Sequence, residues 1–298
     1  MRNLVCFLLV AVAAQISFAT VIHVPSEQPT IQAGIDAAVD GDTVLVANGT
    51  YTGGGNRDID FTGKQVLVMS ASGAQVTTID CEGSAMESHI AFSFHSSETR
   101  QTIIDGFTIT GAYVTDLWSD SGAVRCYSSS PTIRNCVITG NACTGVRSIR
   151  DSSPRLENCI ISANGQHGIH VANLVWPISG LEMYGCTVWG NGQSGLYVQT
   201  GYQITVSNCT FVENGSDGIM FEGDPPKQGG IDDWQTKLEN SLVAYNDGAG
   251  IARVMWYPGL EFYCNDSYGN DGGNYMNVDA YAGDTNGNLS LPPLFCDT

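Results

Sequence analysis

The 298-residue chain carries 30 acidic and 12 basic residues, a formal net charge of −18, with no basic cluster. Nucleic acid is therefore a poor partner, because phosphate binding needs clustered Lys and Arg. An acidic polysaccharide would also be repelled, unless a cation such as Ca²⁺ bridged the two surfaces. Hydrophobic residues make up 43% of the chain, so we expect a folded protein with a sizeable core.

Residues 1–19 are predicted to form a signal peptide. The apolar run from Leu4 to Ala14 follows the basic Arg2 and precedes the small-residue end Ser17-Phe18-Ala19. This run is too short to span a bilayer, and no later segment is long and apolar enough. We therefore expect a secreted, periplasmic or cell-surface protein without a transmembrane segment.

Residues 20–65 are expected to form an N-terminal cap and the first turn of a repeat. Thr30 can cap a short helix, and Ile31, Ile35, Ala38 and Val39 would share one face of it. Gly41 can end this helix. Its apolar face would close the open end of the structure that follows.

Residues 66–275 contain a repeat. Cys or Ser is followed by an apolar residue two positions later and by Asn five positions later, as in Cys136, Ile138 and Asn141. A period of 20 to 50 residues indicates stacked units. The asparagines of the frame are Asn141, Asn164, Asn191, Asn214, Asn246 and Asn270.

Each unit is predicted to contain three short strands. Apolar residues alternate in pairs such as Cys159/Ile161 and Ile169/Val171, and a third apolar residue, such as Leu156, precedes each cysteine. Neither the leucine-rich motif nor a six-residue period is present. The pattern predicts an all-β, right-handed parallel β-helix, a solenoid whose turns lie about 4.8 Å apart.

Within this fold the repeated Asn and Cys residues have structural roles. Asn tolerates the left-handed conformation of a tight turn, and stacked amides can form hydrogen bonds along the axis. The row Cys136, Cys159, Cys186 and Cys209 is expected to hold buried free thiols, because directly stacked strands suit disulfides poorly. The state of Cys81, Cys126, Cys143 and Cys296 stays open.

Several stretches resemble the pectate-lyase-like right-handed parallel β-helix proteins of exported bacterial type. These are "TIQAGIDAA" and "GDTVLVANGTY" within residues 30–51, "TTIDCEGS" at 77–84 and "DGFTITGAY" at 105–113. The resemblance covers nearly all of residues 20–275. It implies the fold and the bacterial origin, whereas the same scaffold carries lyases, hydrolases, esterases, epimerases and adhesins.

Enzymes of that family use outward-facing residues of one sheet, so the resemblance directs attention to Arg147, His170 and Asp217. Arg147 is followed, one repeat at a time, by His170, Tyr197 and Met220 at an outward position. Gln166-His167-Gly168 keeps two residues of the Gly-His-Gly of family hydrolases. No family catalytic set is complete, so Arg147, His170 and Asp217 are the catalytic candidates and the enzyme question stays open.

A substrate-binding edge is predicted from the longer repeats. Their extra residues all fall between the second and the third strand, where aromatic rings accumulate that could stack on sugars. The aromatic candidates are Trp176, Tyr202, Trp234 and Trp256. No cofactor is required, although Asp224, Asp232 and Asp233 on the same edge could supply oxygen ligands for Ca²⁺. The alternative is that these loops bury their own aromatics.

Residues 276–298 are read as a C-terminal segment whose continuation the sequence leaves open. The leading hypothesis is an exported, monomeric domain that binds extracellular or cell-surface polysaccharide. The first alternative is a polysaccharide lyase or glycoside hydrolase acting on acidic glycans. The second is a structural module for surface attachment or adhesion.

Overall fold

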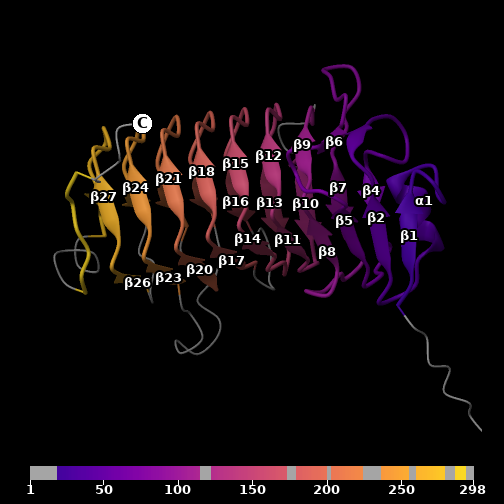
Figure 1. Cartoon of the computed structure of the whole chain (residues 1–298). Helices are drawn as coiled ribbons and strands as arrows, with labels where there is room; N and C mark the ends of the chain where they lie inside the picture. Colours follow the sequence, from indigo (N-terminus) through magenta and orange to yellow (C-terminus); the bar gives the residue numbers. More distant parts are fainter. Residues whose placement is uncertain are drawn as a thin grey trace, which may run out of the picture.

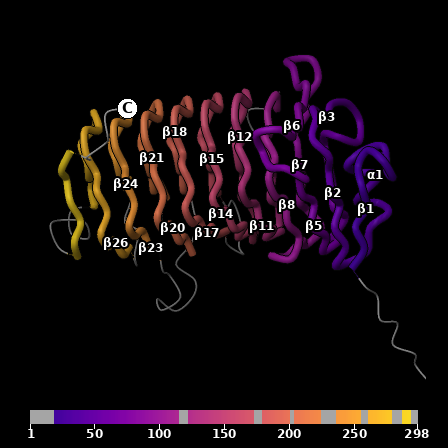
Figure 2. The backbone as a smooth tube through the Cα atoms, in the orientation of Figure 1, coloured from indigo at the N-terminus to yellow at the C-terminus, as the bar shows by residue number. Residues whose placement is uncertain are grey.

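The computed structural model describes residues 19–114, 122–172, 179–199, 203–223, 236–254, 260–278 and 286–292. Their strands form three long sheets that run side by side around one axis, as Figures 1 and 2 show. Every strand pairs in parallel with the equivalent strand of the next turn. The parallel β-helix expected from the repeat is therefore confirmed.

Sheet A holds the strand that precedes each cysteine of the repeat. Its ten strands, in spatial order, are β1 (Val21–Val24), β2 (Thr43–Val46), β5 (Leu67–Ser70), β8 (Ile103–Asp105), β11 (Thr132–Arg134), β14 (Arg155–Glu157), β17 (Leu181–Tyr184), β20 (Ile204–Ser207), β23 (Thr236–Glu239) and β26 (Leu260–Tyr263). Its outward face is charged and carries ion pairs such as Arg134 with Asp105 and Lys237 with Glu239.

Sheet B consists of the strands that follow the cysteine of each turn, or the residue that replaces this cysteine. Its nine strands are β3 (Gly49–Tyr51), β6 (Thr77–Asp80), β9 (Thr108–Thr110), β12 (Val137–Thr139), β15 (Ile160–Ser162), β18 (Thr187–Trp189), β21 (Thr210–Val212), β24 (Leu242–Ala244) and β27 (Asp266–Tyr268). The middle residue of these strands points inward, as the full burial of Ile138, Ile161 and Val188 shows. The residues on either side therefore point outward.

Sheet C consists of the strands that follow the repeated asparagine of each turn. Its nine strands are β4 (Ile59–Asp60), β7 (Phe92–Phe94), β10 (Val124–Tyr127), β13 (Val146–Ile149), β16 (Ile169–Ala172), β19 (Leu196–Val198), β22 (Ile219–Phe221), β25 (Ile251–Arg253) and β28 (Tyr275–Met276). The longer segments of the repeat connect this sheet to sheet A. Contacts between turns continue beyond residue 275, because Asn265 donates a hydrogen bond to Asn288.

The helix α1 (Ile31–Ala37) packs at the N-terminal end against the first strands of the solenoid. Thr30 caps it, with the backbone amide of Ala33 donating to the hydroxyl oxygen at 3.2 Å, as predicted. The prediction for its end was wrong: the helix ends at Ala37, and Gly41 lies in the following turn. Val39 is 54% exposed and does not share the buried face. No helix among the described residues is long and apolar enough to cross a bilayer.

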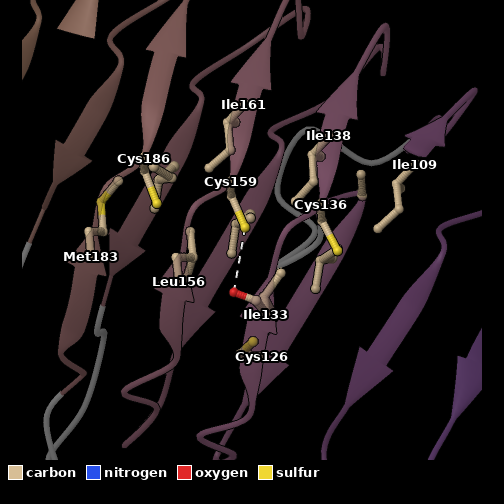
Figure 3. Close-up of a cluster of buried hydrophobic side chains, with 14 of the residues drawn as sticks. Ile109, Cys126, Ile133, Cys136, Ile138, Leu156, Cys159, Ile161, Met183 and Cys186 are labelled. Carbon is tan, nitrogen blue, oxygen red and sulfur yellow. Dashed lines mark hydrogen bonds between the residues drawn. The ribbon is translucent and has the colours of Figure 1, made fainter. Parts of the chain in front are cut away.

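The core is a set of inward rows stacked along the axis, which Figure 3 shows for the middle turns. Ile109, Ile138 and Ile161 come from successive strands of sheet B, and Cys136, Cys159 and Cys186 lie where each turn enters that sheet. Near the N-terminal end the interior is aromatic, with Phe61 and Phe94 at a ring separation of 5.1 Å. Stacking each turn on the next gives every apolar row a buried environment that a single turn lacks.

The six repeated asparagines form a continuous buried ladder. The side-chain Nδ2 of each of the first five donates to the Oδ1 of the asparagine in the next turn, at 2.9 Å from Asn141 to Asn164 and 3.0 Å from Asn191 to Asn214. The expected left-handed conformation lies elsewhere, in the residue before the ladder position, such as Ala163 with a φ of 50°. It also occurs at the asparagine before the cysteine, such as Asn208 with a φ of 55°. The residues with the left-handed conformation and the asparagines of the ladder therefore occupy separate positions of the repeat.

The cysteines in the described part of the chain are free, including the four of the interior row. Burial raises the pKa of Cys136 and of Cys143 to about 12, so both remain protonated thiols at neutral pH. Cys81 and Cys126 are also buried free thiols, and Cys264 is an exposed one. Cys296, whose state the sequence left open, lies outside the described residues.

Candidate functional site

A row of polar and aromatic side chains runs along the outward face of sheet C. Strand register places Arg125 beside Arg147, Arg147 beside His170, and His170 beside Tyr197. The sequence prediction that Arg147, His170 and Tyr197 share one outward position is therefore confirmed. These residues alternate with buried ones, since a strand points successive side chains to opposite faces. In β16, for example, Ile169 and Val171 flank His170 and fill the core.

Two histidines and a tyrosine form a compact ring cluster within this row. The rings of His167 and Tyr197 are stacked, with centroids 4.5 Å apart and an interplanar angle of 13°. The ring of His170 lies 4.6 Å from Tyr197 and 5.2 Å from His167. His167 comes from the turn that leads into β16, so one turn supplies both imidazoles and the next supplies the phenol.

The protein holds both imidazoles in the neutral form. Burial, together with the positive charge of Arg147, lowers the pKa of His167 to about 4. Burial also lowers the pKa of His170 to about 2, again with a contribution from Arg147. At neutral pH both rings are therefore uncharged, and each can accept one hydrogen bond or one proton.

The cluster has unused hydrogen-bonding capacity. Nδ1 of His167 and Nε2 of His170 are buried and make no hydrogen bond with any described residue. The phenol of Tyr197, in contrast, donates to a carboxylate oxygen of Glu222, the residue that follows β22. Unsatisfied buried polar atoms are uncommon in folded proteins, so these two nitrogens are an unusual feature of the cluster.

Positive charge collects beside the cluster. The guanidinium groups of Arg125 and Arg150 lie over the ring of Tyr127, 5.0 and 5.2 Å from its centroid. Both arginines belong to or follow strands of sheet C, as does Arg147. Arg125, Arg147 and Arg150 thus place three guanidinium groups in or beside one outward row of sheet C.

Asp217, the third catalytic candidate, is not brought together with Arg147 and His170. It is buried in the turn before β22, and its Oδ1 accepts a hydrogen bond from the backbone amide of Ala249 at 2.7 Å. That turn lies two rungs beyond His170, about 10 Å along the axis. The carboxylate of Asp217 therefore links one turn of the solenoid to the next.

The predicted aromatic edge lies outside the described residues. Trp176, Tyr202, Trp234 and Trp256 fall in segments 173–178, 200–202, 224–235 and 255–259, as do the Ca²⁺ candidates Asp224, Asp232 and Asp233. Each segment connects a strand of sheet C to the next strand of sheet A. Within the described part of the chain, no group of three His, Cys, Asp or Glu side chains could hold a metal ion.

Sequence reasoning missed three members of the site. His167 was compared only with a hydrolase motif, although it is the ring stacked on Tyr197. Neither Glu222 nor Arg125 was among the catalytic or substrate-binding candidates. Counting positions by the recurring spacing of the strands would have found Arg125, because it lies one turn before Arg147 in the same row.

These turns and sheets define a parallel β-helix solenoid with a polar site on one outward face. The family model for the right-handed β-helix region matches residues 31–175 and 174–267. The chain belongs to this family, which confirms both the fold and its expected handedness. The comparison with curated protein sequences found no match.

Solved structures with the same fold are distant in sequence. The pectate lyase Pel9A is 16% identical with a TM-score of 0.51, over 86% of this chain and 65% of its own. A mannuronan C-5 epimerase A-module from Azotobacter vinelandii is 14% identical, with a TM-score of 0.48 over 87% and 81%. The pectin methylesterase of Aspergillus niger is 12% identical, with a TM-score of 0.49 over 94% and 92%. At these identities the likeness concerns the fold.

Proposed function

We propose that this chain is an exported domain that binds an extracellular polysaccharide along the outward face of sheet C. The supporting observation is the cluster of His167, His170 and Tyr197, whose two buried imidazole nitrogens have no described partner. The ring of Tyr197 is half-buried, and a tyrosine ring can stack on the face of a sugar. The Pel9A pectate lyase, whose name indicates a polysaccharide substrate, shows that the fold suits such ligands.

The charge of this surface favours an acidic glycan. Arg125 and Arg147 occupy adjacent outward positions, and Arg150 lies close by over Tyr127. A guanidinium binds a carboxylate with two parallel hydrogen bonds, which suits a uronate unit. Because the whole protein carries a charge of −18, an acidic chain would be attracted to this surface and repelled elsewhere.

The aromatic edge extends this proposal. Trp176, Tyr202, Trp234 and Trp256 lie on the segments that leave sheet C after β16, β19, β22 and β25. We propose that these four aromatic residues stack on pyranose faces while the arginines bind carboxylates. Asp224, Asp232 and Asp233, on the segment after β22, are proposed as oxygen ligands for a bridging Ca²⁺.

Replacing Arg147 by alanine is expected to weaken binding of polygalacturonate or alginate about tenfold, because a charge-assisted hydrogen bond is lost. Isothermal titration with and without Ca²⁺ measures this loss. Lys237→Ala provides the control, since Lys237 is a cation on the outward face of sheet A. Equal binding by the Arg147 and Lys237 variants would contradict this site. Unchanged binding by Trp176→Ala and Trp234→Ala would show that the proposed aromatic edge does not bind the polymer.

A second candidate function is cleavage of the bound chain. The observation that favours it is the combination of neutral His170 with Tyr197, whose phenol is bonded to Glu222. In an elimination, His170 would take the proton from the carbon next to a uronate carboxylate, a slow step for a base with a pKa of about 2, and the bond to the leaving oxygen would break. Tyr197 would protonate that oxygen while a carbon–carbon double bond forms. Arg147 would stabilise the charge that develops on the carboxylate.

If the domain cleaves acidic glycans, Tyr197→Phe is expected to lower kcat at least about 100-fold, because the proton donor is removed. The ring and its stacking on His167 remain, so affinity for the polymer should change little. Ultraviolet absorbance of the new double bond measures turnover, and Tyr263→Phe on sheet A is the matched control. Absence of product from all acidic polymers tested, at saturating binding, would leave the domain as a binding module.

A further inference from the structure

The outward face of sheet B has a composition unlike that of the other two faces. From β9 to β24 its outward positions carry no charged side chain. They are occupied by Thr108, Thr110, Val137, Thr139, Ile160, Ser162, Thr187, Trp189, Thr210, Val212, Leu242 and Ala244, and all of these except Ser162 and Ala244 are at least partly exposed. Charged residues return at both ends, with Asp80 on β6 and Asp266 on β27. Six consecutive turns of a protein with a charge of −18 thus share an uncharged strip.

Apolar side chains are exposed on this strip. Trp189 is 42% and Ile160 is 41% exposed, while Tyr245, in the turn after β24, is 42% exposed. Trp189 lies beside Ser162 and Val212 in the strand register, so small neighbours leave its ring open. Trp189 and Ile160 lie on neighbouring strands of this strip, and exposed apolar side chains gathered on one face can mark a binding site.

Hydroxyl groups flank the exposed indole. Thr187 lies on the same strand and face as Trp189, and Thr210 is the register partner of Thr187. Thr108 and Thr139 use their hydroxyls in hydrogen bonds within the protein. The described residues provide no such partner for the hydroxyls of Thr187 and Thr210. Both can therefore donate to and accept from a ligand.

The shape of the strip limits what can cover it. Six strands about 4.8 Å apart give a length of about 24 Å, and the two outward positions of each strand give a width of about 10 Å. This is on the order of 240 Å², well below the roughly 800 Å² that each partner of a stable protein complex buries. A long, narrow, uncharged strip is too small for a second copy and suits a single extended chain.

From this shape and chemistry we infer that the outward face of sheet B binds a linear chain of neutral pyranoses, as a second glycan site distinct from sheet C. The indole of Trp189 stacks on a sugar face, and Tyr245 can contact a more distant unit. Thr187 and Thr210 bind hydroxyls. The strip offers no cation to an acidic chain, and the carboxylate of Glu213 at the turn after β21 repels one.

The test is retention of the purified chain on cellulose, chitin, β-1,3-glucan and amylose, beside alginate as an acidic probe. Trp189→Ala is expected to lower retention on the neutral polymer that binds wild type by about tenfold, with alginate binding unchanged. Trp189→Phe should restore part of it. The double variant Thr187→Val and Thr210→Val should lower it several-fold, since it removes two hydroxyls and keeps the shape.

Tyr263→Ala is the matched control, because Tyr263 is an exposed aromatic on the outward face of sheet A. Circular dichroism and thermal unfolding verify that the variants are folded. Retention of Trp189→Ala equal to wild type, or no retention of wild type on any neutral polymer, overturns the inference. So does a wild-type dimer in sedimentation velocity that Trp189→Ala converts to monomer. Arg147→Ala should lower the binding of alginate alone. The proposed sites on sheet B and sheet C are therefore tested independently.

Discussion

Replacing Asn191 by alanine is expected to lower the free energy of unfolding by about 4 kcal/mol. Its Oδ1 accepts hydrogen bonds from the side chain and backbone of Asn164, at 2.9 and 3.2 Å. Its Nδ2 donates to Asn214 and to the carbonyl of Ile161. Asn191 is 1% exposed, so alanine would strand several buried partners, each at a cost of about 1 to 3 kcal/mol. Urea unfolding monitored by circular dichroism measures the loss.

Asn208→Gly is the control for this substitution. Asn208 is an exposed turn residue with a φ of 55°, a conformation that glycine adopts without strain. Its change should therefore cost less than about 1 kcal/mol. A loss for Asn191→Ala as small as that for Asn208→Gly would show that the ladder contributes little to stability.

Acid is expected to destabilise the protein through His167 and His170. In the unfolded chain an imidazole has a pKa of about 6.5, whereas the folded values are about 4 and about 2. Below pH 6.5 the unfolded chain therefore binds more protons than the folded chain, and stability falls as the pH falls. Between pH 6.5 and pH 4.5 the loss should be about 2 kcal/mol for each histidine.

The double variant His167→Gln and His170→Gln should lose most of this pH dependence. The relevant quantity is the change in unfolding free energy between pH 6.5 and pH 4.5, not its absolute value, because glutamine also alters the packing. His23→Gln is the control and should retain the wild-type slope. Equal slopes for wild type and the double variant would show that the two imidazoles are not buried in the neutral state.

The interior of the solenoid could be predicted from the sequence because its requirements repeat. The spacing from Cys136 to Ile138 to Asn141 recurs in the following turns up to Asn246, so the inward rows and the ladder followed from counting positions. The end of α1 could not be predicted in this way. The cap occurs once, and Ala38 closes the helix through backbone hydrogen bonds to Gly34 and Ile35 that no residue pattern signals.

The candidate site was only partly predictable, because its residues do not repeat. Alternation placed Arg147 and His170 on one outward row, but it could not show that His167, from a turn, stacks on Tyr197. Asp217 was also an outward candidate by position. Only the structure shows that its carboxylate is used by Ala249 of the next turn. Side-chain direction in turns depends on neighbouring turns, which a linear pattern does not encode.

The separation between inward and outward rows also affects how this protein can change over evolutionary time. Asn164, Asn191 and Asn214 make equivalent contacts with their neighbours, so each junction between turns has nearly the same geometry. Duplication or loss of one whole turn would lengthen or shorten the solenoid by about 4.8 Å and preserve every junction. New surface chemistry can then be gained by copying a turn and altering its outward residues, while the folding information in the copy stays intact.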